Sequence, residues 1–486
     1  MEEQHVAIDM LAPTGIMDER KIKTSSAEIT RVEENDVVTD ELQNFVKKLG
    51  EVPGEPFKAR PVTIFRLPTW FHDYDKELCE PKIVSIGPYH RGKESLQAIE
   101  EHKWSTLRDF LTRNKNVSFE IYFREMKLLE AQARECYSEA VSLGSNDFVM
   151  MLLLDGCFIL EWFSKDQRDK YSDAILFAAW VWVGITSDLL LLENQIPFFV
   201  IHRLFVIQSG CSQNCEGLCP LLERIYDYEL QPLFLDWVFF RPPKLSCSEI
   251  HHWLHLCRIG VLPDIQLERE QRDLVTGKSY LRALKKFPWS KIFLKSREPF
   301  AIGGQISIPC VTELHEAGVE FRRKREPRDM FDISFHNGIL EMPCVMFEDD
   351  MKCSLWNMAA FEQSQPAITY REKTLSSYLG LMNSLIKTEK DVAILVRSGI
   401  IDHLQNDEQV ANFFNQSFQI FVLDYSDHYF YGLYKDVKRY SESTRHKYRA
   451  RLMHDYFSNP WSVISVVGAI ILLVLSFLQT YYSATK

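Results

Sequence analysis

The 486-residue sequence lacks the short motifs by which many catalytic and nucleotide-binding sites are recognised. It contains no GxSxG nucleophile elbow, no Walker A loop and no GxGxxG fingerprint ahead of a helix. Carboxylate pairs do occur in expected loops, but such pairs are too common by chance to indicate acid–base chemistry. We therefore expect no catalytic residue and no cofactor, although residues far apart in the chain could still form an active site.

Excess positive charge and a secretion signal are also missing. The chain carries 67 acidic and 56 basic side chains, for a net charge of -11, and no basic patch that would indicate a nucleic-acid partner. Its start is acidic and holds no apolar run of the length that a signal peptide needs. The 11 cysteines are odd in number and scattered, as is typical of reduced thiols in a cytosol-facing protein.

Apolar residues, in contrast, are abundant, at 46% of the chain, which is enough for a large core. The composition changes twice along the sequence and defines three expected regions. Residues 1–55 are polar and acidic and indicate a flexible leader. Residues 56–455 have the apolar periodicity of a helical globular body, and residues 456–486 hold a long uncharged stretch.

Helical periodicity dominates the body. Residues 95–114 and 120–141 repeat apolar side chains every three or four positions, which predicts amphipathic helices. Two later stretches are apolar all round, as expected of helices inside a bundle, and charge, Gly or Pro interrupts both well short of a membrane span. The further helices that we expect cover residues 245–258, 313–321, 375–386 and 390–401.

One stretch departs from this pattern. Apolar and polar residues alternate on both sides of Asn337-Gly338, a pair that tolerates positive φ and is typical of a β-hairpin turn. We therefore predict a small β element at about 328–348. The expected fold class is mainly α: a multi-helix globular body with a small β-hairpin element, plus one C-terminal transmembrane helix.

The C-terminal helix is predicted from the uncharged run between Trp461 and Leu478. Eighteen residues at about 1.5 Å each give a helix of roughly 27 Å, close to the hydrocarbon core of about 30 Å. Pro460 suits the first helical turn, and Trp461 and Tyr482 fall where interfacial aromatic residues are expected, which places the span at about 461–482. Membrane lipid is thus an expected partner of this helix.

The charges beside this run predict its orientation. Seven basic residues lie between positions 435 and 451, whereas only Lys486 lies beyond the span. By the positive-inside rule, the N-terminal bulk of the chain is then cytosolic. The sequence thus predicts a tail-anchored, single-pass membrane protein, and it does not distinguish the plasma membrane from an endomembrane.

Two clusters contain side chains that metals use. Cys211, Cys215 and Cys219 are evenly spaced thiols, but a zinc site would need a fourth ligand from far along the chain. His251 and His255 are one helical turn apart, but the Glu of an HExxH protease is absent. We interpret these residues as loop thiols and helix histidines, and we expect no metal.

Six stretches stand out in order along the chain: KIVSIGPYHRGK (82–93), DGCFILEWF (155–163), DLLLLENQIPFFVI (188–201), TELHEAGVEFRR (312–323), NMAAFEQ (357–363) and YFSNPWSVIS (456–465). Together they resemble the signature blocks of the plant family called domain of unknown function 247. The resemblance implies a plant protein with a helical body, one C-terminal membrane anchor, no established catalytic activity and no agreed active-site residues. It also implies a possible role in self-incompatibility if the chain comes from a grass, because some grass members are associated with that process in pollen.

Two of these stretches carry our candidate interaction or structural residues. In the first, a turn presents a tyrosine and a histidine, and in the second, three polar residues come just before a proline that bends the helix. We interpret the second group as a buried hydrogen-bond network, and a ligand site is the alternative. The residues are Gly87, Pro88, Tyr89, His90, Glu193, Asn194, Gln195 and Pro197.

Two functions are compatible with these observations. The first is a membrane-tethered recognition or signalling adaptor that acts through contacts with an unidentified protein partner. The alternative is a membrane-surface enzyme with an unrecognised active site between the SIGPYH and LLENQIPF stretches. The enzyme requires these two stretches to meet at a concave site whose polar groups face a void.

Overall fold

The computed structural model divides the chain into two units between Ala59 and Arg60, and the residues that it describes all belong to the second unit. The predicted leader, the cluster of Cys211, Cys215 and Cys219, and residues 443–459 lie outside the described residues. The described ranges are 62–113, 117–163, 178–210, 220–225, 246–263, 307–365, 368, 372–421, 423–424, 428–442 and 460–484.

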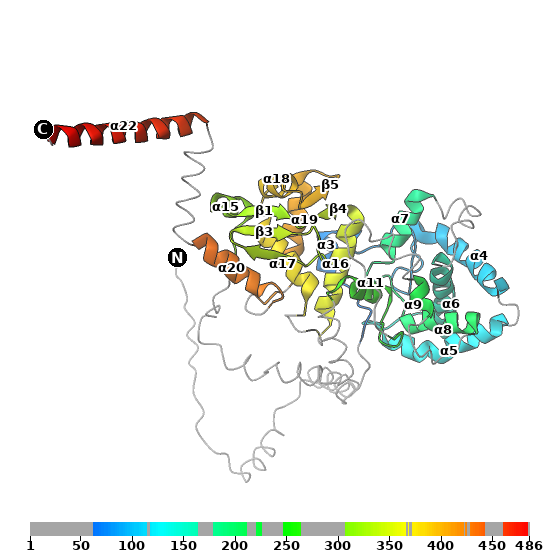
Figure 1. Cartoon of the computed structure of the whole chain (residues 1–486). Helices are drawn as coiled ribbons and strands as arrows, with labels where there is room; N and C mark the ends of the chain where they lie inside the picture. Colours follow the sequence, from blue (N-terminus) through cyan, green and yellow to red (C-terminus); the bar gives the residue numbers. More distant parts are fainter. Residues whose placement is uncertain are drawn as a thin grey trace, which may run out of the picture. The chain divides into compact units, whose positions relative to one another are not determined.

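The first part of the body is a helical bundle built around α6 (Ser145–Trp162). This helix is apolar all round, as predicted, and nearly all its side chains after the first turn are buried. It contacts α4 (Gln97–Arg113), α5 (Phe119–Glu135) and α8 (Phe198–Ser209) (Figure 1). Both α4 and α5 bury one face and expose the other, so their predicted amphipathic character is confirmed.

Three shorter helices accompany the bundle: α7 (Ala179–Asp188), α9 (Pro220–Ile225) and α11 (Trp253–Val261). The start of α11 corrects the predicted helix at 245–258. His252 is extended and its side chain accepts a hydrogen bond from the His255 N–H, which is the geometry of a helix N-cap. The helix therefore begins after His252.

Residues 62–96 form an irregular segment with three short helices. A parallel bridge joins Ile64 to Tyr137, and the Phe71 ring packs edge-on against Trp356 and Phe421. The segment therefore contacts both the bundle and the part of the body that follows it. The short helices are α3 (Thr69–Tyr74), η1 (Lys76–Leu78) and η2 (Glu94–Leu96).

The first sheet has the strand order β1-β3-β2. Strands β2 (Ser334–His336) and β3 (Ile339–Met342) are the antiparallel arms of a hairpin, and β1 (Glu320–Arg323) pairs in parallel with β3 (Figure 1). Asn337 and Gly338 at the turn have φ values of 52° and 83°, the positive values that a tight hairpin turn needs. The predicted β element is thus confirmed.

A second, parallel pair consists of β4 (Val345–Phe347) and β5 (Ile401–His403). Helices pack around the two sheets. Aromatic side chains are buried between the helices and the sheets. The predicted helix at 375–386 is confirmed as α17. The helices of this part are α15 (Val311–Glu316), α16 (Asp349–Ser364), α17 (Thr374–Leu385), α18 (Glu389–Arg397), α19 (Asp407–Ile420) and α20 (Tyr431–Glu442).

Three predicted helices end earlier than their periodicity indicated. The helix predicted at 120–141 ends at Glu135, and glycine explains the ends of the other two. Gly318 follows α15 with a φ of 86°, and Gly399 follows α18 with a φ of 67°. A left-handed glycine terminates a helix and reverses the chain. Consequently Phe321, at the end of the predicted helix 313–321, lies in β1, and Ile401, at the end of 390–401, opens β5.

The C-terminal run forms α22 (Pro460–Ala484). Its side chains are exposed from Ala469 to Tyr481, whereas the side chains of residues 460–467 and of Tyr482 lie outside those described, including the predicted boundary residues. Within the described part of the chain, no helix is both long enough and apolar enough to cross a membrane.

Candidate functional site

The two stretches that hold the candidate residues meet in the folded chain. The residues from Gly87 to His90 lie in the loop between η1 and η2, and those from Glu193 to Pro197 lie between α7 and α8. All of the candidate residues are buried except Pro88 and Tyr89, which are partly buried. Hydrogen bonds link the two loops directly, so the question is whether any polar group is left for a ligand.

Asn194 is the centre of this contact. Its Oδ1 accepts a hydrogen bond from the Ile86 N–H at 2.6 Å, and its Nδ2 donates to the carbonyl oxygens of Val84 at 3.0 Å and Asp188 at 2.9 Å. Both amide N–H donors and the carbonyl of the side chain are therefore engaged. Asn194 is fully buried, so it fixes the two loops together and has no free donor for a ligand.

Gly87 and Gln195 make the closest approach between the loops. Gly87 has a φ of 78°, and a Cβ at this position would lie 2.3 Å from the carbonyl oxygen of Gln195. The Gln195 side chain donates to the carbonyls of Leu189 and Leu191, both at 2.7 Å, and accepts from the Leu254 N–H at 3.2 Å. Only glycine satisfies both the backbone angle and the space at position 87.

A buried ion pair contacts the turn at Gly87. Lys103 of α4 and Asp155 of α6 are both 0% exposed, with Lys103 Nζ 2.7 Å from Asp155 Oδ1. Asp155 Oδ2 accepts from the Gly87 N–H at 2.8 Å, and Lys103 also donates to the Ser85 carbonyl and to Glu100. Two charges can be buried here because each one has a partner and further hydrogen bonds.

Glu193 joins this loop to the N-terminal segment. One carboxylate oxygen accepts from the Leu67 N–H at 2.7 Å and lies 2.9 Å from His72 Nε2, and the other lies 3.1 Å from His90 Nε2. Burial alone would raise the pKa of Glu193, but hydrogen bonds from His90 and Leu67 and the nearby imidazoles hold that pKa below its usual range. Glu193 is thus an ionised anchor for three groups.

The remaining candidates have local structural contacts. The Tyr89 ring packs edge-on against Tyr137 at 5.6 Å, and its hydroxyl lies 3.3 Å from Ser138 Oγ. Pro88 completes the turn after Gly87. Pro197 is the residue that precedes α8, where its fixed φ is compatible with a helix start.

Sequence reasoning missed Asp188, although it holds the same loop. Its carboxylate accepts the backbone N–H groups of Lys82, Ile83 and Val84 at 2.9, 2.6 and 2.8 Å. Burial raises the pKa of Asp188 to about 6, against the three N–H donors, which lower it. The only signal in the sequence was a single acidic residue beside an apolar run, and Asp155 is likewise a single acidic residue, within an apolar run.

A second buried ion pair was also missed. Arg258 of α11 and Glu362 of α16 are fully buried, with Arg258 Nη2 3.0 Å from Glu362 Oε1. Glu362 also accepts from the N–H groups of Leu375 at 3.2 Å and Ser376 at 2.9 Å, at the start of α17. A carboxylate at a helix N-terminus satisfies N–H groups that have no partner within the helix.

The histidines that formed a metal candidate are in the core. The His251 and His255 rings stack 4.5 Å apart, and burial is the main reason that the pKa of His251 falls to about 4 and that of the neighbouring His252 to about 3. These rings are therefore neutral at physiological pH. Across the described residues, no group of His, Cys, Asp or Glu is arranged to hold a metal ion.

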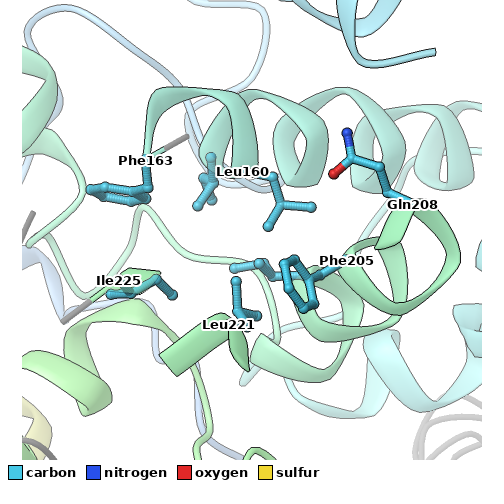
Figure 2. Close-up of a pocket in the computed structure, with 8 residues that line it drawn as sticks. Leu160, Phe163, Phe205, Gln208, Leu221 and Ile225 are labelled. Carbon is cyan, nitrogen blue, oxygen red and sulfur yellow. The ribbon is translucent and has the colours of Figure 1, made fainter. Parts of the chain in front are cut away.

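Two cavities lie away from the two loops. One of about 10 Å³, enough for a single water molecule, lies between α6, α8 and α9, where Figure 2 shows Leu160, Phe163 and Phe205 at its wall. The other is a groove of about 530 Å³ beside Trp104. Neither is lined by a candidate residue. The polar groups of the candidates bond to each other and to nearby groups of the chain, except the buried Nδ1 of His90, which has no hydrogen-bond partner among the described residues.

These features define a mainly helical protein with small sheets and a buried polar network that joins distant loops. The chain belongs to the family DUF247, described as plant protein of unknown function, whose profile matches residues 64–475. It is 28% identical to UPF0481 protein At3g47200 of Arabidopsis thaliana, over 86% of this chain and 85% of that protein. It is 22% identical to a second UPF0481 protein of Arabidopsis thaliana, At3g02645, over 86% and 90%. No solved structure matches the chain.

Proposed function

We propose that this plant protein is a membrane-tethered recognition or signalling adaptor that acts through contacts with another protein. The carrying observation is the exposure of large apolar side chains on a body whose polar candidates, apart from His90 Nδ1, are bonded internally. Trp70, Trp104 and Trp180 are 51, 53 and 77% exposed. Each leaves on the order of 100 Å² of ring in water, and covering it would contribute roughly 2–3 kcal/mol.

The two loops are explained better as a structural network than as an active site. An active site between them needs polar groups that can reach a substrate, yet Asn194, Gln195 and Glu193 bond to backbone and side chains of the same chain. Buried and bonded in this way, such groups contribute rigidity. The adaptor is therefore the function that we put forward, and the enzyme is the outcome to be tested against it.

The tether in this proposal is α22. Its sequence, which is uncharged from Trp461 to Leu478, and its exposed apolar side chains from Ile470 to Leu478 support a membrane anchor, and the basic residues that precede it support a cytosolic body. We expect a glycosylation-acceptor tag placed after Lys486 to be modified in microsomes, while the natural sequons at Asn116 and Asn415 are not. Modification of Asn116 would contradict this orientation. If the tag stays unmodified and alkaline carbonate extracts the chain from the membranes, the tether is contradicted.

Purification of the chain from its native membranes after mild cross-linking tests the adaptor. We expect one partner in a constant stoichiometric ratio to the chain, and we expect that ratio to survive a wash at high salt. Recovery of chaperones and trafficking factors alone would contradict an adaptor. Turnover of a small-molecule substrate by the purified chain, abolished by a change at Glu193, would favour the enzyme.

A further inference from the structure

An open, mostly apolar groove lies between α4 and the start of α5. Its volume is about 530 Å³, and it is a wide-open depression of the surface and not an enclosed cavity. The groove is shaped by two helices that already pack on α6. Its lining residues are Trp104, Leu107, Arg108, Leu111, Thr112, Val117 and Phe119.

The groove is fixed before any partner arrives. Leu107 and Phe110 of α4 are buried in the core, and the Lys103–Asp155 ion pair holds the same helix to α6. Trp104 and Arg108 therefore project from a helix whose position is set by other residues. A preformed groove binds with less loss of conformational freedom than a surface that must fold around its ligand.

Charge selects among the possible occupants. Arg108 is exposed, makes no ion pair with another described residue, and is the only charged residue among the described residues that line the groove. A guanidinium beside an apolar floor is complementary to a carboxylate at the edge of an apolar helix face. It disfavours a basic amphipathic helix by like-charge repulsion.

We infer that the groove is the partner-binding site of the adaptor and that it takes an amphipathic helix of a partner protein, with two or three large apolar side chains over Trp104 and a carboxylate against Arg108. This inference rests on the proposed function and specifies the chemistry of the partner. Tryptophan and arginine are also the side chains that most often dominate the affinity of an interface.

Two synthetic helices test this assignment on the purified full chain. Both are labelled, about 16 residues long, and carry leucine and phenylalanine at i, i+3, i+4 and i+7; one has Glu and the other Lys at the edge of that face. We expect the Glu peptide to bind at least about tenfold more tightly than the Lys peptide in fluorescence anisotropy. Trp104→Ala should weaken the Glu peptide by about tenfold or more, and Arg108→Glu should reverse the preference.

Trp180→Ala is the control, because it removes a tryptophan that is even more exposed than Trp104, at 77% against 53%, from α7, outside the groove. We expect no change in peptide affinity for this variant. Equal affinity of the two peptides for the unmodified chain, or an affinity that Trp104→Ala leaves intact, would overturn the assignment.

The same variants separate the two proposals. If purification from membranes returns the stoichiometric partner and Trp104→Ala retains it, the groove is the wrong surface and the adaptor stands. If the unmodified chain returns no partner while the Glu peptide shows the expected dependence on Trp104 and Arg108, the groove stands and the proposed adaptor is wrong in the membrane tested.

Discussion

The two loops and the α4–α5 groove use opposite kinds of side chain. In the loops, buried polar and charged groups bond to one another, as in Lys103 with Asp155 and Asn194 with the backbone of residues 84–86. In the groove, an apolar ring remains in water, with Trp104 more than half exposed. The loops therefore have contacts that are complete within the chain, whereas the groove has contacts that another molecule would complete. This difference predicts large stability effects in the loops and small ones in the groove.

The largest expected effect follows removal of one member of the buried ion pair. Asp155→Ala leaves the ammonium of Lys103 in the core and removes the acceptor of the Gly87 N–H. We expect a loss of about 3–5 kcal/mol in the free energy of unfolding, measured by denaturant titration.

Two further variants show whether that loss comes from the unpaired buried charge. Lys103→Met combined with Asp155→Leu removes both charges and should recover part of the stability, because no lone charge is buried. Glu139→Ala breaks the exposed pair with Arg66 at 3.3 Å and should change stability by at most about 0.5 kcal/mol. Similar losses for Asp155→Ala and Glu139→Ala would mean that the inner pair is solvated.

A glycine pair isolates the contact between the loops. Gly87→Ala imposes both a positive φ and a Cβ at 2.3 Å from the Gln195 carbonyl, so we expect a loss of about 2–4 kcal/mol. Gly92→Ala imposes a φ of 84° with no atom within 4 Å, so it should cost only about 1 kcal/mol. The difference between the denaturant midpoints of the two variants measures the cost of the close contact between Gly87 and the Gln195 carbonyl. Equal midpoints would show that the loops can move apart to accept the Cβ.

The buried histidines predict an acid-sensitive core. The pKa of His252 falls to about 3 on folding, so between pH 6.5 and 3 the unfolded chain binds a proton that the folded chain does not. The stability from this residue is present above pH 6.5 and declines as the pH falls. From pH 7 to pH 5 the loss should be about 2 kcal/mol.

A matched variant separates His252 from other titrating groups. Asp188, whose pKa rises to about 6, acts in the opposite direction, since the folded chain then takes up a proton before the unfolded chain. Comparing the pH dependence of the original chain with that of His252→Gln cancels Asp188. If both proteins lose the same stability between pH 7 and pH 5, His252 is not the origin of the effect.

The sequence predicted the parts of this fold that depend on local order. Asn337-Gly338 defines the hairpin by itself because both residues accept positive φ, and α4, α5 and α6 follow from apolar spacing. The sequence predicted a network at the three polar residues from Glu193 to Gln195, and each of these side chains is hydrogen-bonded in the structure. Their position beside a proline and within an apolar run is a local signal.

The partners in that network could not be predicted, because they depend on packing between distant residues. Lys103 and Asp155 are 52 positions apart, and the Leu192 N–H bonds to Asn357, which is 165 positions further on. The groove could not be predicted from the sequence for the same reason. Trp104, Leu107 and Leu111 share a helix face in the sequence, but α6 covers only part of that face, and the sequence does not state which part.

The expected effect on stability at the groove is smaller than in the core. Trp104→Ala removes a ring that is 53% exposed and should cost only about 1–2 kcal/mol, because only its covered part loses contacts. Trp162→Ala removes a ring that is 5% exposed and stacked on Phe158, and should cost about 3–5 kcal/mol. Denaturant titration of the two variants compares the same chemical change in the two environments. A large loss for Trp104→Ala would mean that the ring is already covered by this chain, and the groove would then have no vacancy for a partner.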